Sequence, residues 1–110
     1  MKPEASDLIL VYRGRTKQVL CSVGYDVSND ILTSEIRVER NPTSELIATW
    51  DVSFVADGVD GELLLTLDAP ATSAVAQNKG YMDIKRVTGG QPVNVFDEPL
   101  EVLFKDPVTA

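Results

Sequence analysis

Residues 46–68 read LIATWDVSFVADGVDGELLLTLD, and this stretch decides the fold. Its first part places apolar side chains at every second position: Ala48, Trp50, Val52, Phe54 and Ala56. Its second part continues the pattern with Leu63, Leu65 and Leu67. Because such alternation is typical of strands that bury one face, the stretch predicts strands over 46–57 and 62–68, with Trp50 and Phe54 anchoring the core.

The two predicted strands are separated by Asp57-Gly58 and Asp60-Gly61. Asp-Gly pairs are strong turn formers because glycine adopts backbone conformations that other residues resist. We therefore expect the two strands to form a hairpin.

The same alternation recurs on both sides of this hairpin. It predicts strands over 16–25, 34–40, 80–87, 93–96 and 100–105, and a nearly all-apolar run predicts a short buried strand over 7–12. Gly14, Asn41-Pro42 and Gly89-Gly90 separate these runs, and the turn-forming side chains of Asp26 to Asp30 predict a loop. In the run over 16–25, Val19, Cys21, Val23 and Tyr25 share one face, which we expect to be buried.

Residues 69–77 are rich in alanine and are the one stretch with helical character. Pro70 suits a first helical turn, and Gly80 is placed to end the helix. One short helical crossover among seven or eight strands in 110 residues predicts a single all-β domain over 1–110, an immunoglobulin-like β-sandwich. A small barrel is the alternative.

The charge distribution argues against a nucleic-acid partner. The formal net charge is −7, and residues 41–78 contain acids but no Lys or Arg, so that stretch would repel phosphates. The one basic cluster, Arg13, Arg15 and Lys17, has no aromatic side chains interleaved with it, as a surface for single strands would need.

The apolar runs, such as Leu8 to Tyr12, are far shorter than the roughly 20 residues of a membrane-spanning helix. The segment Met1 to Asp7 is polar and lacks the apolar run of a secretory signal peptide. We therefore expect no membrane partner and synthesis in a cytoplasm.

The residue types of the common catalytic mechanisms are missing. The chain has no histidine and a single cysteine, Cys21, so it has no Ser-His-Asp or Cys-His arrangement, disulfide or multi-cysteine metal site. Cys21 is in phase with a buried face, and we expect it in the core and not as a nucleophile. No enzymatic activity, catalytic residue or cofactor is predicted.

Three further motifs have a functional and a structural interpretation. Asp57, Asp60 and Glu62 could act as a general acid and base or bind calcium weakly, but acids beside glycine are usually turn formers and the spacing is not that of a calcium loop. Trp50 could stack on a ligand, although its phase predicts packing. Residues 87–91 contain two glycines but no phosphate-binding motif. We predict no metal site.

Two segments of the C-terminal half carry a family resemblance: Leu67-Asp68-Ala69-Pro70-Ala71-Thr72-Ser73-Ala74-Val75 and Gly80-Tyr81-Met82-Asp83-Ile84-Lys85. They resemble a family of tailed-phage and prophage structural proteins in which a strand ends in Leu-x-Ala, a Thr-containing helical turn crosses over, and Gly-Tyr opens the next strand. The N-terminal domain of phage baseplate upper proteins is the member compared. Looser matches are Arg13-Gly14, Ile36-Arg37-Val38 and Asp106-Pro107-Val108-Thr109. Asp97-Glu98-Pro99 departs from the family pattern and puts the pairing of the final strand in doubt.

The resemblance implies an immunoglobulin-like sandwich that docks onto other virion structural proteins and has no catalytic residues. It predicts a tail or baseplate component that is assembled in repeated copies, as a homo-oligomer, after synthesis in the bacterial host cytoplasm. The alternative is a stand-alone carbohydrate- or protein-binding module of bacterial origin that uses loops near Asp26 to Asp30.

Overall fold

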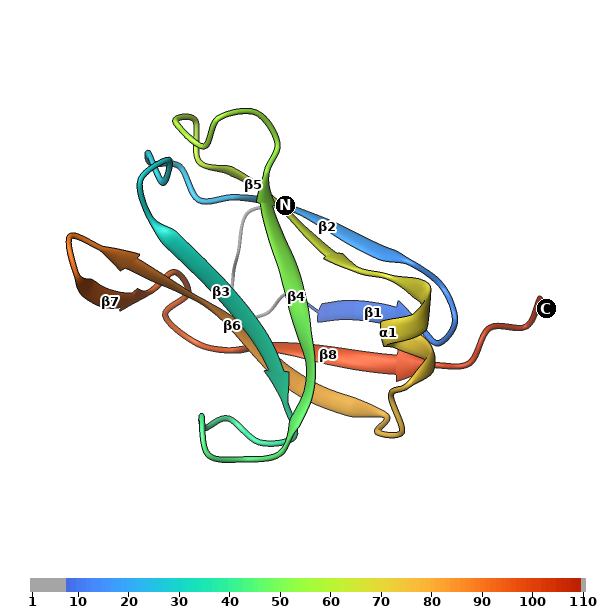
Figure 1. Ribbon diagram of the computed structural model, residues 1–110. Coiled ribbons are helices and arrows are strands. Elements are labelled where there is room, and N and C mark those ends of the chain that lie inside the picture. Colours follow the sequence, from blue (N-terminus) through green and yellow to red (C-terminus); the bar gives the residue numbers. More distant parts are fainter. Residues whose placement is uncertain (1–7, 110) are drawn as a thin grey trace.

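The computed structural model describes residues 8–109, so the polar segment 1–7, including the expected strand start at Asp7, lies outside the described residues. The described chain forms eight strands and one helix. These are β1 (Leu8–Tyr12), β2 (Lys17–Ser22), β3 (Ile31–Arg37), β4 (Leu46–Phe54), β5 (Glu62–Leu67), α1 (Ala69–Ser73), β6 (Lys79–Thr88), β7 (Gln91–Asn94) and β8 (Leu100–Lys105). The expected all-β domain with one short helical crossover is confirmed (Figure 1).

The strands form two layers that share β4. The strand order is β1-β8-β6-β3-β4-β5-β2, with β7 on β6. The first half of β4, up to Trp50, pairs with β3, and its second half, from Asp51, pairs with β5. No pairing between β1 and β2 is found among residues 8–109, so the path of strands is not a closed barrel.

The topology is that of an immunoglobulin-like sandwich. In that fold, strands A, B, E and D form one sheet and strands C, F and G the other. Here β2, β5 and the second half of β4 take the places of B, E and D, and β3, β6 and β8 take those of C, F and G. β1 lies parallel to β8.

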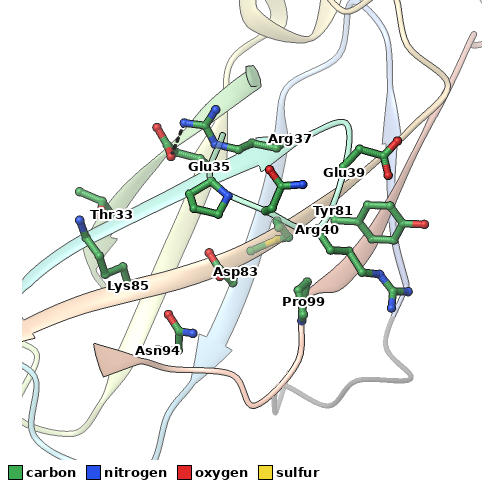
Figure 2. A pocket seen from close by; sticks show the side chains of 13 residues that line it. Thr33, Glu35, Arg37, Glu39, Arg40, Tyr81, Asp83, Lys85, Asn94 and Pro99 are labelled. Atoms are coloured by element: carbon green, nitrogen blue, oxygen red, sulfur yellow. Dashed lines mark hydrogen bonds and ion pairs between the residues drawn. The ribbon is translucent and has the colours of Figure 1, made fainter. Parts of the chain in front are cut away.

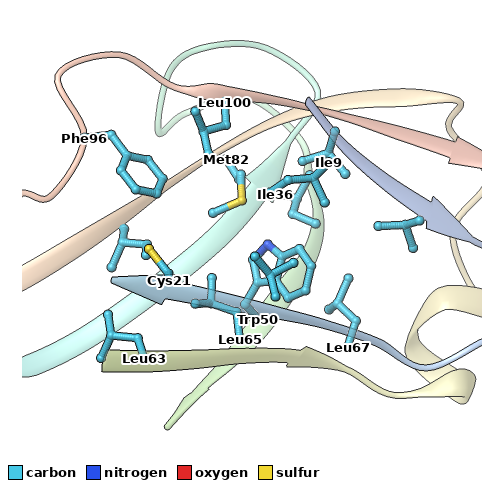
Figure 3. Packing of buried hydrophobic residues seen from close by; sticks show 14 of the residues in the cluster. Ile9, Cys21, Ile36, Trp50, Leu63, Leu65, Leu67, Met82, Phe96 and Leu100 are labelled. Carbon is cyan, nitrogen blue, oxygen red and sulfur yellow. The ribbon is translucent and has the colours of Figure 1, made fainter. Parts of the chain in front are cut away.

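Side chains from both layers meet in one core (Figure 3). Cys21 on β2, Leu65 on β5 and Met82 on β6 are buried, as the sequence predicts. Trp50 is only 2% exposed and fills the centre of this core from β4. The packing interpretation of Cys21 and Trp50 is confirmed, and burying an aromatic side chain of this size contributes about 2–3 kcal/mol.

Two strands, β7 and β8, pair one after the other with the same side of β6. β7 pairs with residues 85–88 of β6 and β8 pairs with residues 79–82, so both lie on the same side of β6. The intervening segment contains Pro99, which lacks a backbone donor and interrupts the ladder. Between the two strands, the amide of Val95 still donates to the Ile84 carbonyl at 2.8 Å. The pairing of the final strand is thus settled, because β8 lies between β6 and β1.

The crossover helix is shorter than expected. Asp68 caps α1 by accepting a hydrogen bond from the Ala71 amide at 2.9 Å, and Pro70 lies in its first turn. The helix ends at Ser73, so the prediction that Gly80 ends it is wrong. Gly80 instead lies in β6, where a Cβ would come within 2.8 Å of the Ile36 side chain, which is why glycine is needed there.

Several strand predictions need correction, among them the strand expected over 93–96, which runs from Gln91 to Asn94. The second strand ends at Ser22 and not at Tyr25, because Gly24 has φ +79° and turns the chain. Tyr25 is therefore 40% exposed and not on the buried face. The strand expected over 34–40 runs from Ile31 to Arg37, shifted toward the N-terminus. Ala56 lies beyond the end of β4 and is exposed.

Between residues 8 and 109, no helix has the length and apolar character required to cross a membrane.

Candidate functional site

A groove of about 360 Å³ lies on the outer face of β3 and β6 and is also lined by the 39–42 turn and by Pro99 (Figure 2). Outward-facing side chains from β3 and β6 form its floor, since alternate residues of these strands point into the core. Six of its lining residues carry charge: Glu35, Arg37, Glu39, Arg40, Asp83 and Lys85.

Arg37 and Glu35 neutralise each other at one wall of the groove. The Arg37 Nη2 lies 3.0 Å from the Glu35 Oε1, and the Arg37 Nη1 donates to the Ser44 carbonyl at 2.7 Å. These contacts fix the guanidinium against the 39–45 turn, so it is a rigid part of the wall.

Asp83 lies on the floor of the groove without an ion pair or hydrogen bond to its carboxylate among the described residues. Burial, and then the charge of Glu35, raise the pKa of Asp83 above its ordinary value. Both causes disfavour the charged carboxylate. A cation or hydrogen-bond donor on a bound molecule would stabilise the charged carboxylate of Asp83.

Tyr81 lines the groove from β6, and two cations lie close to its ring. The guanidinium carbon of Arg40 is 4.6 Å from the ring centroid, and the ammonium of Lys79 is 5.4 Å from it. Lys79 also pairs with Glu101 at 3.7 Å. An aromatic side chain stacked with arginine is typical of protein interfaces, whereas a sugar ring would need an uncovered aromatic face.

The groove therefore offers ion pairs, hydrogen bonds and apolar contacts to a partner. Cys21 is not part of it, since that thiol is 1% exposed in the core. Among residues 8–109, no group of three or more His, Cys, Asp and Glu side chains is arranged to hold a metal ion.

The acids singled out near Gly58 are used in local hydrogen bonds. Asp57 accepts from the Val59 amide and Asp60 from the Glu62 amide, each at 3.0 Å. The Glu62 carboxylate accepts from the Ser22 hydroxyl at 2.8 Å. The contacts of Asp57 and Asp60 are those of turn formers, whereas Glu62 bonds across to β2, and the hairpin predicted around these acids is confirmed.

The loop at Asp26 to Asp30 is held by its own side chains and by the core. Asp26 accepts hydrogen bonds from the hydroxyl and the amide of Ser28, and these, the hydroxyl bond first, lower the pKa of Asp26. Val27 is fully buried. The loop proposed for ligand binding is therefore confirmed as a loop, but most of its side chains are occupied internally.

Asp30 ties this loop to β6. Its Oδ2 lies 2.8 Å from the Arg86 Nε, and the two side chains are only 5% and 17% exposed. Neither the Asp30 Oδ2 nor the Arg86 Nε has a hydrogen-bond partner within residues 8–109, so the contact between them is an ion pair. Arg86 also lies 4.5 Å from the Tyr25 ring centroid.

The basic cluster at residues 13–17 does not form one surface. Arg13 is turned inward onto the segment that follows α1, while Arg15 is exposed and donates to the Thr109 carbonyl. Residues 87–91 form the end of β6 and a turn at Gly89-Gly90, as expected.

The sequence did not single out the groove. Its residues come from two strands, a turn and the segment before β8, which only the fold brings together. In the sequence, Glu35 and Arg37 alternate with Ile36 and Val38 and so predict a solvent-facing row, but nothing in the spacing indicates that Asp83 and Tyr81 lie beside them.

Comparisons with known proteins find matches among solved structures. No protein-family model matches the chain, and no curated protein sequence does. Among similar solved structures is the extracellular domain of a voltage-gated sodium channel beta4 subunit, described as a parallel homodimer with a role in cell-cell adhesion, at TM-score 0.43 and 10% identity over 96% of each chain. A likeness of this degree carries no argument about function.

Proposed function

We propose that this chain is an assembly module that binds another protein through the groove between β3 and β6, as a structural component of a phage or prophage tail or baseplate. The observation that carries the proposal is the groove itself, with Tyr81 and Arg40 stacked beside the unpartnered carboxylate of Asp83. Tyrosine and arginine are enriched among the residues that contribute most to protein binding.

The family resemblance supports the choice of virion proteins as partners. The two segments that carry it, 67–75 and 80–85, correspond to the end of β5 with α1 and to the first half of β6. Tyr81, Asp83 and Lys85 are therefore both resemblance residues and groove residues.

The alternative is a carbohydrate- or protein-binding module. A carbohydrate would need an aromatic ring face on which a sugar can stack. The rings of Tyr25 and Tyr81 are each stacked with a cation, and Trp50 is in the core. We therefore favour a protein over a glycan as the partner. A glycan array probed with the wild-type chain and with Tyr81→Ala tests this choice, since a signal lost in the variant would favour the carbohydrate module.

The proposal is tested on particles from the phage or prophage that encodes the chain. We expect quantitative mass spectrometry of purified particles to find the chain at a fixed copy number, cross-linked through Lys79 or Lys85 to another virion protein. Particles that lack the chain should bind the recombinant wild type and bind Arg40→Ala at least tenfold more weakly, with Arg15→Ala as the matched control. Purified particles without the chain would overturn the proposal.

A further inference from the structure

Among residues 8–109, β1 and β7 are two of the strands of the sandwich for which pairing is found on one side only. β1 pairs with β8, and β7 pairs with β6. The N–H and C=O groups on the other side of an edge strand can pair with a strand of another chain, and proteins often block such edges with proline or charge. These two edges differ in that respect.

The outer edge of β7 is blocked. The turn before it has two residues, Gly89 and Gly90, both with positive φ, and the Val95 amide continues the ladder to β6. Because successive residues point to opposite sides of a strand, the backbone groups of Pro92 and Asn94 face away from β6. Pro92 has no N–H, so this edge has lost one of its two donors.

The outer edge of β1 is not blocked. The Arg13 amide donates to the Lys105 carbonyl at 2.9 Å, so the backbone groups of Leu8, Leu10 and Tyr12 alternate to the side away from β8. The Tyr12 carbonyl accepts from the Arg15 amide, and within residues 8–109 no backbone hydrogen bond reaches Leu10 from the side away from β8. The sequence LILVY contains neither a proline nor a charge.

Apolar side chains accompany these unpaired backbone groups. Leu8 is 55% exposed and Tyr12 is 42% exposed. Leu10 lies between them, half-buried, with Leu103 of β8 as its neighbour in the register. An apolar edge strand of this kind is a template for strand addition.

We propose that the occupant of this edge is a second copy of the chain, whose β1 pairs antiparallel with the first and places Leu10 on the two-fold axis. Leu8 of each copy then lies opposite Tyr12 of the other, so both exposed side chains are covered. The proposal deepens the assembly function above, on which it rests, by naming one contact between copies.

The charge of the chain favours this edge for self-association. With a net charge of −7, two copies repel each other over most of their surfaces. β1 is uncharged, and its pattern is self-complementary about Leu10, as a two-fold interface requires. A five-residue strand buries little area, so we expect a weak dimer, with a Kd of about 0.1–1 mM.

Sedimentation of the full chain from roughly 20 μM to 2 mM tests the proposal. We expect the wild type to form dimers over this range and Leu10→Lys, which places two lysines at the axis, to dimerise at least tenfold more weakly. Ile31→Lys is the matched control, because Ile31 is 68% exposed on the same sheet face but lies on β3. A wild type that stays monomeric at 2 mM would overturn the proposal.

A mixing experiment tests the register. In the proposed pairing, Leu8→Lys in one chain faces Tyr12→Glu in the other, so a mixture of the two variants should form a heterodimer about fivefold tighter than either homodimer. Equal affinities for the three species would rule out the two-fold antiparallel register.

Amide exchange of the wild type gives a readout that needs no variant. We expect the amides of Leu10 and Tyr12 to exchange fast at 20 μM and several-fold more slowly at 2 mM, with the amide of Val11 unchanged. No slowing at Leu10 would overturn the proposal. If the chain is monomeric but still binds particles through its groove, the proposed assembly function is supported and only the proposed β1–β1 contact is rejected.

Discussion

The helix α1 lies at one end of the sandwich, and the loop at 23–30 and the β4–β5 turn lie at the opposite end (Figure 1). A single side chain holds the first end together, whereas backbone groups of two loops hold the second. Arg13 donates to the carbonyls of Val75 and Gln77 at 2.9 and 2.7 Å and to the Asn78 side chain at 2.8 Å. We call this set of contacts the arginine clamp.

At the other end, the loop at 23–30 lies on the β4–β5 turn. The Val23 amide donates to the Gly61 carbonyl and the Val27 amide to the Gly58 carbonyl, each at 2.9 Å. The comparison teaches that the two ends have opposite sensitivities. A substitution that removes side-chain atoms, such as Arg13→Ala, should disrupt the arginine clamp. A substitution that adds one methyl group, such as Gly61→Ala, should disrupt the contact between the loops.

Gly61→Ala should have the largest effect. The new Cβ would lie 2.5 Å from the Tyr25 carbonyl oxygen at a residue with φ +76°. Backbone on both sides leaves no flexible group to give way, so we expect the free energy of unfolding to fall by about 3 kcal/mol, as measured by urea denaturation.

Gly24→Ala is the matched control for this variant. Gly24 has φ +79°, but a Cβ there would meet nothing within 4 Å, so only the backbone cost of about 1 kcal/mol remains. Equal losses in the two variants would show that backbone strain, and not the contact between loops, sets the effect.

Arg13→Ala should be next, with a loss of about 2–3 kcal/mol in the same measurement. The substitution leaves two carbonyls in a partly buried position without their charged donor. The ion pair with Asp106 adds little, because the Asp106 side chain is 81% exposed.

Arg13→Lys separates geometry from charge in the arginine clamp. Lysine keeps the charge but cannot reach three acceptors in one plane, so we expect it to recover less than half of the loss. A lysine variant as stable as the wild type would show that the clamp acts through charge alone.

Asp30→Ala at the loop end should cost about 2 kcal/mol, because it leaves the Arg86 guanidinium buried without its counter-ion. The double variant Asp30→Ala/Arg86→Met removes both charges and should recover most of that stability. A double variant that is less stable than Asp30→Ala would show that the Arg86 contact with Tyr25 matters more than the ion pair.

The smallest effect is expected at Asp83, in the groove and at neither end. Burial, and then the charge of Glu35, raise the pKa of Asp83 in the folded state, so its charged form lowers stability at neutral pH, and this penalty disappears as the pH falls through the raised pKa and the ordinary carboxyl range. We expect Asp83→Asn to have a slightly higher Tm than the wild type at pH 7 and the same Tm near pH 3. A lower Tm at pH 7 would contradict the assignment.

Most of the fold could be predicted from the sequence, because alternation reports burial directly. The rows containing Leu65 and Met82 are buried as their phase indicates, whereas in the row of Trp50 only Trp50 is buried, Ala48, Val52 and Phe54 are half-buried and Ala56 is exposed. The predictions failed where tertiary contacts override local signals. Gly80 is placed in the sequence where it could end a helix, but it lies in β6, where the side chains of Ile36 and Ile47 pack against it. Tyr25 is in phase with a buried row, but Gly24 turns the chain first.

The groove could not be predicted in the same way. Glu35 and Asp83 are 48 positions apart and become neighbours through the β3–β6 register. A sequence pattern identifies the side of a strand on which a residue lies, but not which strand lies beside it.

The sequence by itself determined the class of this protein: short alternating strands, one crossover, and no histidine for the common catalytic arrangements. The tertiary structure decided which strands are neighbours, which arginine is turned inward, and which edge is left without a block. The physical reason is the distance along the sequence over which each interaction acts. Alternation and turn formation act between residues a few positions apart, whereas pairing and packing depend on contacts that exist only once the whole chain has folded.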